Sequence, residues 1–251
     1  MKSHLQPIVV MNWKMNPGTY TEARTLAHAT ARFQKSFPGI VYVAPPVPFL
    51  YPLVRGVRSL RYVAQGVHEE SQGAHTGGVS VSQVQDAGAC GVLIGHAEQR
   101  AAGETNEQIT QKVSLATRSG LSAIVCVGES VRDSSGEYLL TVREQITAAV
   151  SAIQPRALKQ LCIAYEPVWA IGADTPMGTH DMHEMSLYIR KILSELFGKT
   201  ARVVPVLYGG SIDAETARNM MLYGDVQGVL VGRASIDPVK VKDLLTVLST
   251  V

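Results

Sequence analysis

Eight short apolar runs, separated by polar segments, constrain the fold of this 251-residue chain more than any other feature. Most of the runs are continuously apolar rather than alternating, which is typical of parallel strands buried on both faces. The segments between them show helical periodicity, for example over residues 104–119, 137–153 and 179–197. Strand and helix are therefore predicted to alternate eight times. The runs are IVVMNW, IVYVAPP, RYVAQG, GVLIGH, SAIVCVG, LCIAYEPVW, VVPVLYGG and GVLVGR.

This alternation predicts an α/β fold built on one parallel sheet. Parallel neighbours need helical crossovers, and eight such units in about 250 residues match a closed (β/α)8 barrel, although a doubly wound sheet gives a similar pattern. We favour the barrel, with eight parallel strands and outer helices. No linker or low-complexity tract divides the sequence, so residues 1–251 are predicted to form a single domain.

The composition argues against several classes of function. Lys and Arg are scattered and the formal net charge is only +2, so no nucleic-acid partner is expected. The amino terminus lacks a signal-peptide core, and no run of about 18 apolar residues occurs, so a cytoplasmic protein with no membrane partner is predicted. Cys90, Cys126 and Cys162 lie in or beside apolar runs without zinc-site spacing and are predicted to be buried, reduced thiols.

Polar residues that could carry chemistry follow three of the predicted strands. Asn12 and Lys14 follow the first strand, His96 the fourth and Glu166 the sixth. Taken singly, Lys14 fits a solvated surface cation, His96 a structural histidine, and Glu166 an acid that meets solvent or a neighbouring Lys. Because the carboxyl ends of barrel strands meet at one mouth, a cation, an imidazole and a carboxylate are expected to converge there.

Glu166 also stands at the root of a distinctive segment, AYEPVWAIGADTP. Pro167 stiffens the backbone directly after the acid, and Trp169, Ile171 and Gly172 form an apolar arm with a flexible joint. An acid at the base of a movable apolar flap suggests a general base that can be closed off from water.

Glycine-rich corners follow the last two predicted strands. In YGGSI, Gly209, Gly210 and Ser211 stand where a strand turns into a helix, and Gly232 of VGRAS offers a second corner. Backbone N–H groups at such corners can bind an anion. One Gly-Gly pair is usually only a tight turn, but two successive corners match the position where barrel enzymes commonly hold phosphate.

Two other groups of polar residues have simpler explanations. His180 and His183, with Glu184 beside them, have helical spacing but lack a third converging ligand, so they are predicted to be exposed and no metal site is expected. Asp225 and Asp237 fall at loop or helix-start positions, where helix capping is the ordinary role.

Several long motifs together resemble the triosephosphate isomerase family, over nearly the whole chain and in the same order. They are NWKMN, GHAEQR followed by GETNEQITQKV, CVGE, AYEPVWAIG and YGGSI. The resemblance implies the fold of that family, the TIM barrel, and a small phosphorylated sugar as substrate. It implies an aldose–ketose isomerase that interconverts D-glyceraldehyde 3-phosphate and dihydroxyacetone phosphate in glycolysis and gluconeogenesis, with no cofactor and no metal.

The resemblance also implies a role for each matching residue. Glu166 would shuttle a proton between adjacent carbons, neutral His96 would polarise the oxygens, and Lys14 with Asn12 would stabilise the enediolate. Glu98 would support Lys14, and residues 167–176 would form a lid and its hinge. The implied phosphate-binding residues are Gly172, Ser211, Gly232 and Arg233, and the implied supporting residues are Cys126, Tyr208, Gly209 and Gly210.

Residues 64–80, AQGVHEESQGAHTGGVS, resemble the family's dimer loop. A long loop is usually either functional or mobile, and here an interface is favoured, which predicts a homodimer. Thr76, near the tip, is expected to reach the partner's active site, and Gln65 is assigned to the same loop.

Three features depart from the family pattern. Ala97 stands where the family usually has a serine whose hydroxyl holds the catalytic carboxylate in the open state, and the lid tip reads ADTPMG. Arg233 replaces the second glycine of the last phosphate corner and adds a planar charged donor. Arg at this corner also resembles a sister branch that acts on a four-carbon ketose phosphate, L-erythrulose 1-phosphate, which stays an alternative. A barrel that binds a sugar phosphate without catalysis is a second alternative, although all four implied catalytic residues are present.

Overall fold

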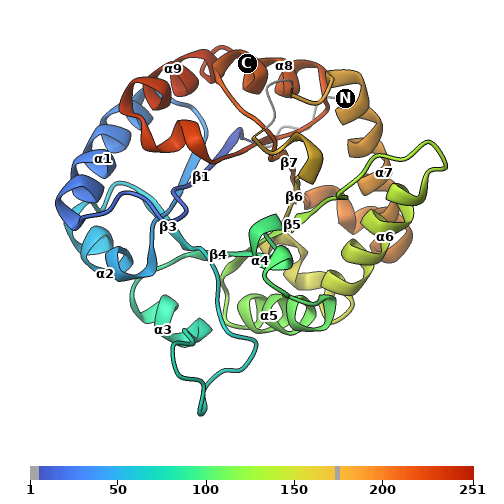
Figure 1. The fold of residues 1–251 in the computed structure, drawn as a ribbon, viewed down its shortest axis with the longest axis horizontal. Coiled ribbons are helices and arrows are strands. Elements are labelled where there is room, and N and C mark those ends of the chain that lie inside the picture. Colours follow the sequence, from blue (N-terminus) through green and yellow to red (C-terminus); the bar gives the residue numbers. More distant parts are fainter. Residues whose placement is uncertain (1–5, 173–175) are drawn as a thin grey trace.

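The chain folds into a closed barrel of eight parallel strands surrounded by helices (Figure 1). This computed structural model describes residues 6–172 and 176–251. Each strand pairs with its neighbours in chain order, and β1 pairs with β8 to close the sheet. The predicted barrel is confirmed, and the doubly wound alternative is wrong because such a sheet is open. The strands are β1 (Ile8–Asn12), β2 (Ile40–Ala44), β3 (Arg61–Ala64), β4 (Gly91–Ile94), β5 (Ser122–Val127), β6 (Leu161–Tyr165), β7 (Val206–Tyr208) and β8 (Gly228–Val231).

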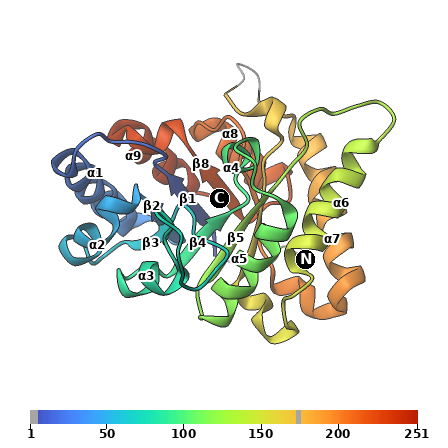
Figure 2. The same cartoon turned by 60° about the horizontal axis from the view of Figure 1, so that its bottom comes forward.

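Helices cover the outside of this barrel. They are α1 (Tyr20–Phe33), α2 (Val47–Gly56), α3 (Val81–Asp86), α4 (Ala97–Ala101), α5 (Asn106–Arg118), α6 (Glu137–Val150), α7 (Thr179–Phe197), α8 (Ala214–Tyr223) and α9 (Pro238–Leu248). Short 3-10 helices lie in the connections: η1 (Gln34–Ser36), η2 (Pro155–Gln160), η3 (Val168–Ala170), η4 (Gly198–Val203) and η5 (Arg233–Ile236). Figure 2 shows α1, α2 and α9 on one side of the strands and α6 and α7 on the other. Within the described ranges, no helix combines the length and apolar character needed to cross a membrane.

Helix boundaries follow local capping rather than periodicity alone. The helix predicted over 179–197 is α7, with the same limits. The helix predicted from residue 104 begins at Asn106, because the Thr105 side chain accepts a hydrogen bond from the Gln108 backbone and the Gln108 side chain accepts one from the Thr105 backbone. Such a capping box satisfies N–H groups that the first helical turn leaves without partners. Periodicity therefore located the helix, while side-chain chemistry set its start.

Two apolar layers explain why the strand sequences are continuously apolar. Side chains that point inward fill the barrel, and those that point outward pack under the helices. Cys126 and Cys162 are buried, as predicted. The prediction for Cys90 is wrong, because this residue precedes β4 in a surface connection and is exposed. The inner layer consists of Val10, Ala44, Val63, Leu93, Ile124, Cys126, Cys162, Ala164, Leu207 and Leu230.

Candidate active site

A cavity of about 610 Å³ opens at the carboxyl ends of the strands. Polar side chains that are far apart in the sequence reach it from the ends of β1, β4 and β6. The convergence expected from barrel geometry is therefore present. The cavity is lined by Asn12, Lys14, His96 and Glu166, and by Gly172, Gly209, Gly210, Ser211, Gly232 and Arg233.

Glu166 directly follows β6 and is buried, with only 4% of its surface exposed. Burial raises the pKa of its carboxyl group, while the neighbouring His96 and the Cys126 thiol act in the opposite direction and lower it. A carboxylate held out of water binds a proton more strongly than one in solution. The site thus contains a group suited to act as a general base.

The imidazole of His96 faces this carboxylate, with Nε2 3.4 Å from Glu166 Oε1. His96 caps the start of α4, and its Nδ1 accepts a hydrogen bond of 3.2 Å from the Glu98 backbone N–H. A ring nitrogen that accepts a hydrogen bond carries no proton, so in this arrangement the imidazole proton lies on Nε2. Nε2 can therefore donate to an oxygen atom inside the cavity.

Lys14 occupies a tight turn after β1. Its φ of 51° lies in the left-handed region, which residues with a β-carbon rarely adopt. The turn is held by the Asn12 side-chain oxygen, which accepts from the Lys14 N–H at 3.0 Å, and by Gln65 Nε2, which donates to the Lys14 carbonyl at 2.7 Å. The ammonium nitrogen lies 2.6 Å from Glu98 Oε1, the contact that the family resemblance implies. A strained turn at a candidate active site is consistent with a positioned cation.

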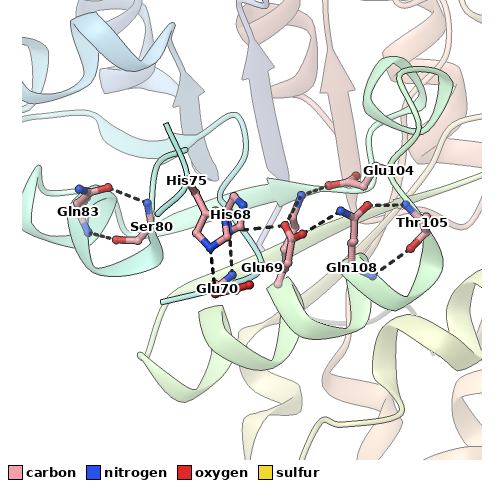
Figure 3. A network of polar contacts seen from close by, with 10 residues as sticks. His68, Glu69, Glu70, His75, Ser80, Gln83, Glu104, Thr105 and Gln108 are labelled. Atoms are coloured by element: carbon pink, nitrogen blue, oxygen red, sulfur yellow. Dashed lines mark hydrogen bonds and ion pairs between the residues drawn. The ribbon is translucent and has the colours of Figure 1, made fainter. Parts of the chain in front are cut away.

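A chain of polar contacts ties the end of β4 to the loop 64–80 (Figure 3). Glu104 accepts a hydrogen bond of 3.0 Å from the Gly95 N–H and pairs with Lys112 at 2.6 Å. Lys112 also lies 3.9 Å from Glu69 in the loop. Sequence reasoning missed this network, because ion pairs between distant segments leave no local pattern.

Glu129, which ends the CVGE motif, is a further buried acid to which sequence reasoning assigned no role. Its carboxylate accepts hydrogen bonds from the Tyr165 hydroxyl at 2.9 and 3.0 Å and from Trp169 Nε1 at 2.8 Å. Trp169 belongs to η3, at the root of the flap, so Glu129 ties the flap to the barrel. An acid at the end of a buried strand was the available signal, but nothing in the sequence pairs it with Trp169.

The corner after β7 lies against both the base and the flap. A β-carbon on Gly209 would lie only 2.6 Å from Cγ of Glu166, so glycine is required for this close approach. The Tyr208 hydroxyl accepts a hydrogen bond of 3.4 Å from the Met177 N–H at the far end of the flap. Burial raises the pKa of Tyr208 to about 12, so this hydroxyl stays protonated at neutral pH.

Two of the three departures from the family pattern fall inside the described residues. Oε2 of Glu166 is buried and has no hydrogen-bond partner among the described residues. The backbone amide of Ala97 lies close enough to lower the pKa of the Glu166 carboxyl group, but Ala97 has no hydroxyl that could donate to Oε2. Nη2 of Arg233 lies 3.4 Å from the position a β-carbon of Gly172 would occupy, so the guanidinium reaches the flap. The lid-tip residues 173–175 lie outside the described residues.

Some of the remaining sequence predictions are confirmed and others are wrong. His180 and His183 are exposed, as predicted. The expectation that no third ligand converges there is wrong, because possible ligand atoms of His180, Asp181 and Glu184 all lie within 4.8 Å of one another. All three residues are at least partly exposed. Both carboxylates also pair with Arg132, at 3.4 and 3.6 Å, which supplies the charge partner that a cation would otherwise provide. We therefore do not assign a metal site to His180, Asp181 and Glu184.

The capping prediction is confirmed for Asp237, whose side chain accepts hydrogen bonds from the first N–H groups of α9. It is wrong for Asp225. That residue follows α8 with a φ of 53° in a connection to β8, where no helix begins. Its carboxylate instead accepts a hydrogen bond of 3.1 Å from Nε of Arg190.

A closed parallel barrel with a buried acid, a neutral imidazole and an ammonium group at the carboxyl ends of its strands defines a (β/α)8-barrel enzyme. The sequence model of the family described as Triosephosphate isomerase matches residues 7–248. The chain belongs to the triosephosphate isomerase family.

Relatives named triosephosphate isomerase cover nearly all of this chain. The protein from Bradyrhizobium sp. strain BTAi1 is 35% identical, over 98% of this chain and 98% of the relative. That from Protochlamydia amoebophila is 37% identical, over 93% and 90%. That from Xanthobacter flavus is 34% identical, over 100% of both.

Proposed function

We propose that the protein is an isomerase that interconverts D-glyceraldehyde 3-phosphate and dihydroxyacetone phosphate, as the names of its relatives indicate. The observation that carries the proposal is the buried Glu166 carboxylate, 3.4 Å from the neutral imidazole of His96 in one cavity with Lys14. Binding of a sugar phosphate without catalysis does not require an acid with a raised pKa next to the Nε2–H donor of an imidazole.

The proposed reaction moves one proton between two carbons and a second proton between their oxygens. The Glu166 carboxylate takes a proton from the carbon next to the carbonyl, and the bonding electrons shift onto the carbonyl oxygen to give an enediolate. Nε2–H of His96 and the ammonium of Lys14 stabilise the negative oxygen, since both donors are fixed before the charge develops. A second proton passes from the hydroxyl group on the deprotonated carbon to the former carbonyl oxygen, with Nε2 of His96 as the relay. Glu166 then returns its proton to the former carbonyl carbon, and the electrons form the new carbonyl at its neighbour. Atoms and electrons balance, so this scheme needs no cofactor or metal.

The phosphate end of the substrate is proposed to bind where the flap meets the two glycine corners. Gly172, Ser211 and Gly232 line that side of the cavity and offer donors from backbone or hydroxyl groups. Arg233 adds a charged donor that reaches the flap. Closing the flap over a bound phosphate would exclude water and strengthen the electrostatic contacts at the reacting carbons.

Arg233 and Ala97 are proposed to set the preference between three-carbon and four-carbon substrates, because the base and the electrophile serve both reactions equally. We expect the parent enzyme to turn over both, with the three-carbon pair slightly favoured. Arg233→Gly combined with Ala97→Ser should raise the kcat/KM ratio further toward the three-carbon pair, within the ~10–200-fold range that one carbon group usually allows.

Coupled assays of dihydroxyacetone phosphate and L-erythrulose 1-phosphate measure this ratio. Arg202→Gly, at an exposed position outside the cavity, is the matched control and should leave the ratio unchanged. A ratio that does not move in the double variant would show that both departures are neutral. Parent activity on the four-carbon compound alone would show that the proposed substrate is wrong.

A homodimer in the cytoplasm, acting in glycolysis and gluconeogenesis, completes the proposal. The loop 64–80 supports the interface, because it begins at the active site and ends in an exposed tip. Gln65 donates to the carbonyls of Lys14 and Ala44, at 2.7 and 2.8 Å, while Thr76 is exposed. Met15, next to Lys14, is 92% exposed and is therefore available to such an interface.

Thr76→Arg together with a shortened 69–76 loop should therefore give monomers with impaired catalysis. The added charge would be buried at the interface without a partner, which is costly. Sedimentation at micromolar concentration and kcat/KM measure the two effects, and Thr200→Arg at another exposed site is the control. An unmodified protein that sediments as a monomer would refute the dimer.

A further inference from the structure

A second cavity, of about 470 Å³, opens at the opposite end of the barrel from the candidate active site. Its lining comes from residues that lead into strands rather than from those that follow them. Arg58 and Leu60 precede β3, Arg61 is the first residue of β3, and Gly88 and Cys90 lie between α3 and β4. Because parallel strands all run the same way, these residues gather at the amino ends of the strands, and no step of the proposed reaction uses them.

Three guanidinium groups, those of Arg55, Arg58 and Arg61, line this cavity, against a single acid, Asp86. All four residues are exposed, and within the described part of the chain none of the three arginines lies within ion-pair distance of a carboxylate. The cavity therefore carries an excess of positive charge that the protein itself does not neutralise.

Some other arginines of the chain have a carboxylate partner. Arg132, Arg143 and Arg190 each lie beside a carboxylate, at 3.4, 2.8 and 3.1 Å. Those contacts account for their positions as ordinary surface ion pairs. No such contact accounts for the three arginines that gather in the second cavity.

Two of the three guanidinium groups are held by aromatic neighbours. Arg55 lies over the ring of Tyr51, 5.4 Å from its centroid. Arg61 is the register partner of Tyr42 between β2 and β3, and its side chain is hydrogen-bonded to Tyr42. Burial raises the pKa of Tyr42, and this hydrogen bond acts in the opposite direction. Fixed donors lose less side-chain freedom when they bind an anion.

The rest of the lining suits a charged ligand that is partly enclosed. Val54, Leu60 and Ala87 supply apolar wall, which lowers the local dielectric and strengthens charge–charge contacts. The Cys90 thiol already donates to the Tyr62 carbonyl at 3.3 Å. Although the residue as a whole is exposed, partial shielding of the thiol from water raises its pKa, so the cavity is not arranged for thiolate chemistry.

We propose that this cavity is a binding site for a small oligophosphate, with Arg58 and Arg61 as its main ligands and Arg55 at its rim. The planar fork of arginine matches phosphate oxygens with two parallel hydrogen bonds. Three such forks exceed what one phosphate group requires, and the volume accommodates a chain of phosphates. The site lies at the far end of the barrel, so its ligand does not compete with substrate. This inference is independent of the proposed isomerase activity.

Calorimetric titration of the full chain with inorganic tripolyphosphate at low ionic strength tests the site. We expect Arg58→Gln/Arg61→Gln to bind at least about tenfold more weakly, since a hydrogen bond to a charged group is lost at each position. The double variant should have the kcat and KM of the parent. If tripolyphosphate also inhibits competitively at the active site, the inhibition constant should be the same for both proteins. Arg61→Lys, which keeps the charge and loses the fork, should fall between the two.

Arg202→Gln removes one exposed arginine from η4, which leads into β7 across the barrel from β3, and should leave the titration unchanged. A parallel titration with ATP in the absence of metal distinguishes two possible ligands. If ATP and tripolyphosphate bind with equal affinity, the site recognises the phosphate chain alone; if ATP binds more tightly, the site recognises a nucleoside triphosphate. The proposal is overturned if neither compound binds outside the active site, if the double variant binds like the parent, or if Arg202→Gln weakens binding as much as the double variant does.

Discussion

Replacing Glu166 with Gln should lower kcat by ~10²–10⁴-fold or more while leaving the fold intact. Gln has nearly the same shape as Glu, but its amide cannot accept a proton from carbon. Substrate binding should change little, because the proposed phosphate contacts come from the glycine corners and the flap. Steady-state kinetics and thermal unfolding of the purified variant measure both expectations.

The matched control is Glu144→Gln, an exposed acid on the outer helix α6. It removes the same charge without touching the cavity and should keep parental kinetics. If Glu166→Gln turned over substrate at near parental speed, another group would have to be the base, and the assignment of Glu166 would be wrong.

Gly209→Ala should also lower kcat strongly, by about 10²-fold, although it replaces none of the proposed catalytic residues. The added β-carbon would lie 2.6 Å from Glu166 Cγ, so the side chain of the base must shift. A displacement of about 1 Å from the reacting geometry can cost on the order of 10²-fold in rate. The loss should appear in kcat more than in KM, because the base acts in the transition state.

Gly18→Ala is the matched control for this change, since a β-carbon at Gly18 meets no atom within 4 Å. Its kinetics should equal those of the parent. Parental activity in Gly209→Ala would show that Glu166 tolerates displacement, and the close packing around the base would then have no catalytic meaning.

The fold could be predicted from the sequence because its signal is repeated and local. Each buried parallel strand needs a continuous apolar run, and each crossover needs a helix, so the alternation appears eight times in the sequence itself. Element limits were less accessible. The start of α5 depends on the reciprocal contact between Thr105 and Gln108, which periodicity does not report.

The candidate site was predictable where position along a strand decides the outcome. Asn12, Lys14, His96 and Glu166 all stand at strand ends, and a closed barrel brings such ends together. The errors concern residues in connections, where tertiary contacts decide. Cys90 beside β4 is exposed, and Asp225 pairs with Arg190 instead of capping a helix.

Contacts between distant segments were invisible to sequence reasoning for the same reason. The hydrogen bond from Trp169 to Glu129 joins residues 40 positions apart. The second cavity likewise gathers Arg58 and Cys90 from either side of β3 and α3. Neither arrangement follows from composition or spacing, because each depends on how the connections fold against the closed sheet.

Proton transfer by Glu166 is tested most directly by isomerisation of dihydroxyacetone phosphate in D₂O, followed by nuclear magnetic resonance of the product. A carboxylate that takes a proton from one carbon and returns it to the next can exchange that proton with solvent. We expect D-glyceraldehyde 3-phosphate in which a fraction of the molecules carries a single solvent deuterium, at the carbon that receives the proton. Absence of conversion, or conversion with deuterium at any other carbon, would contradict it.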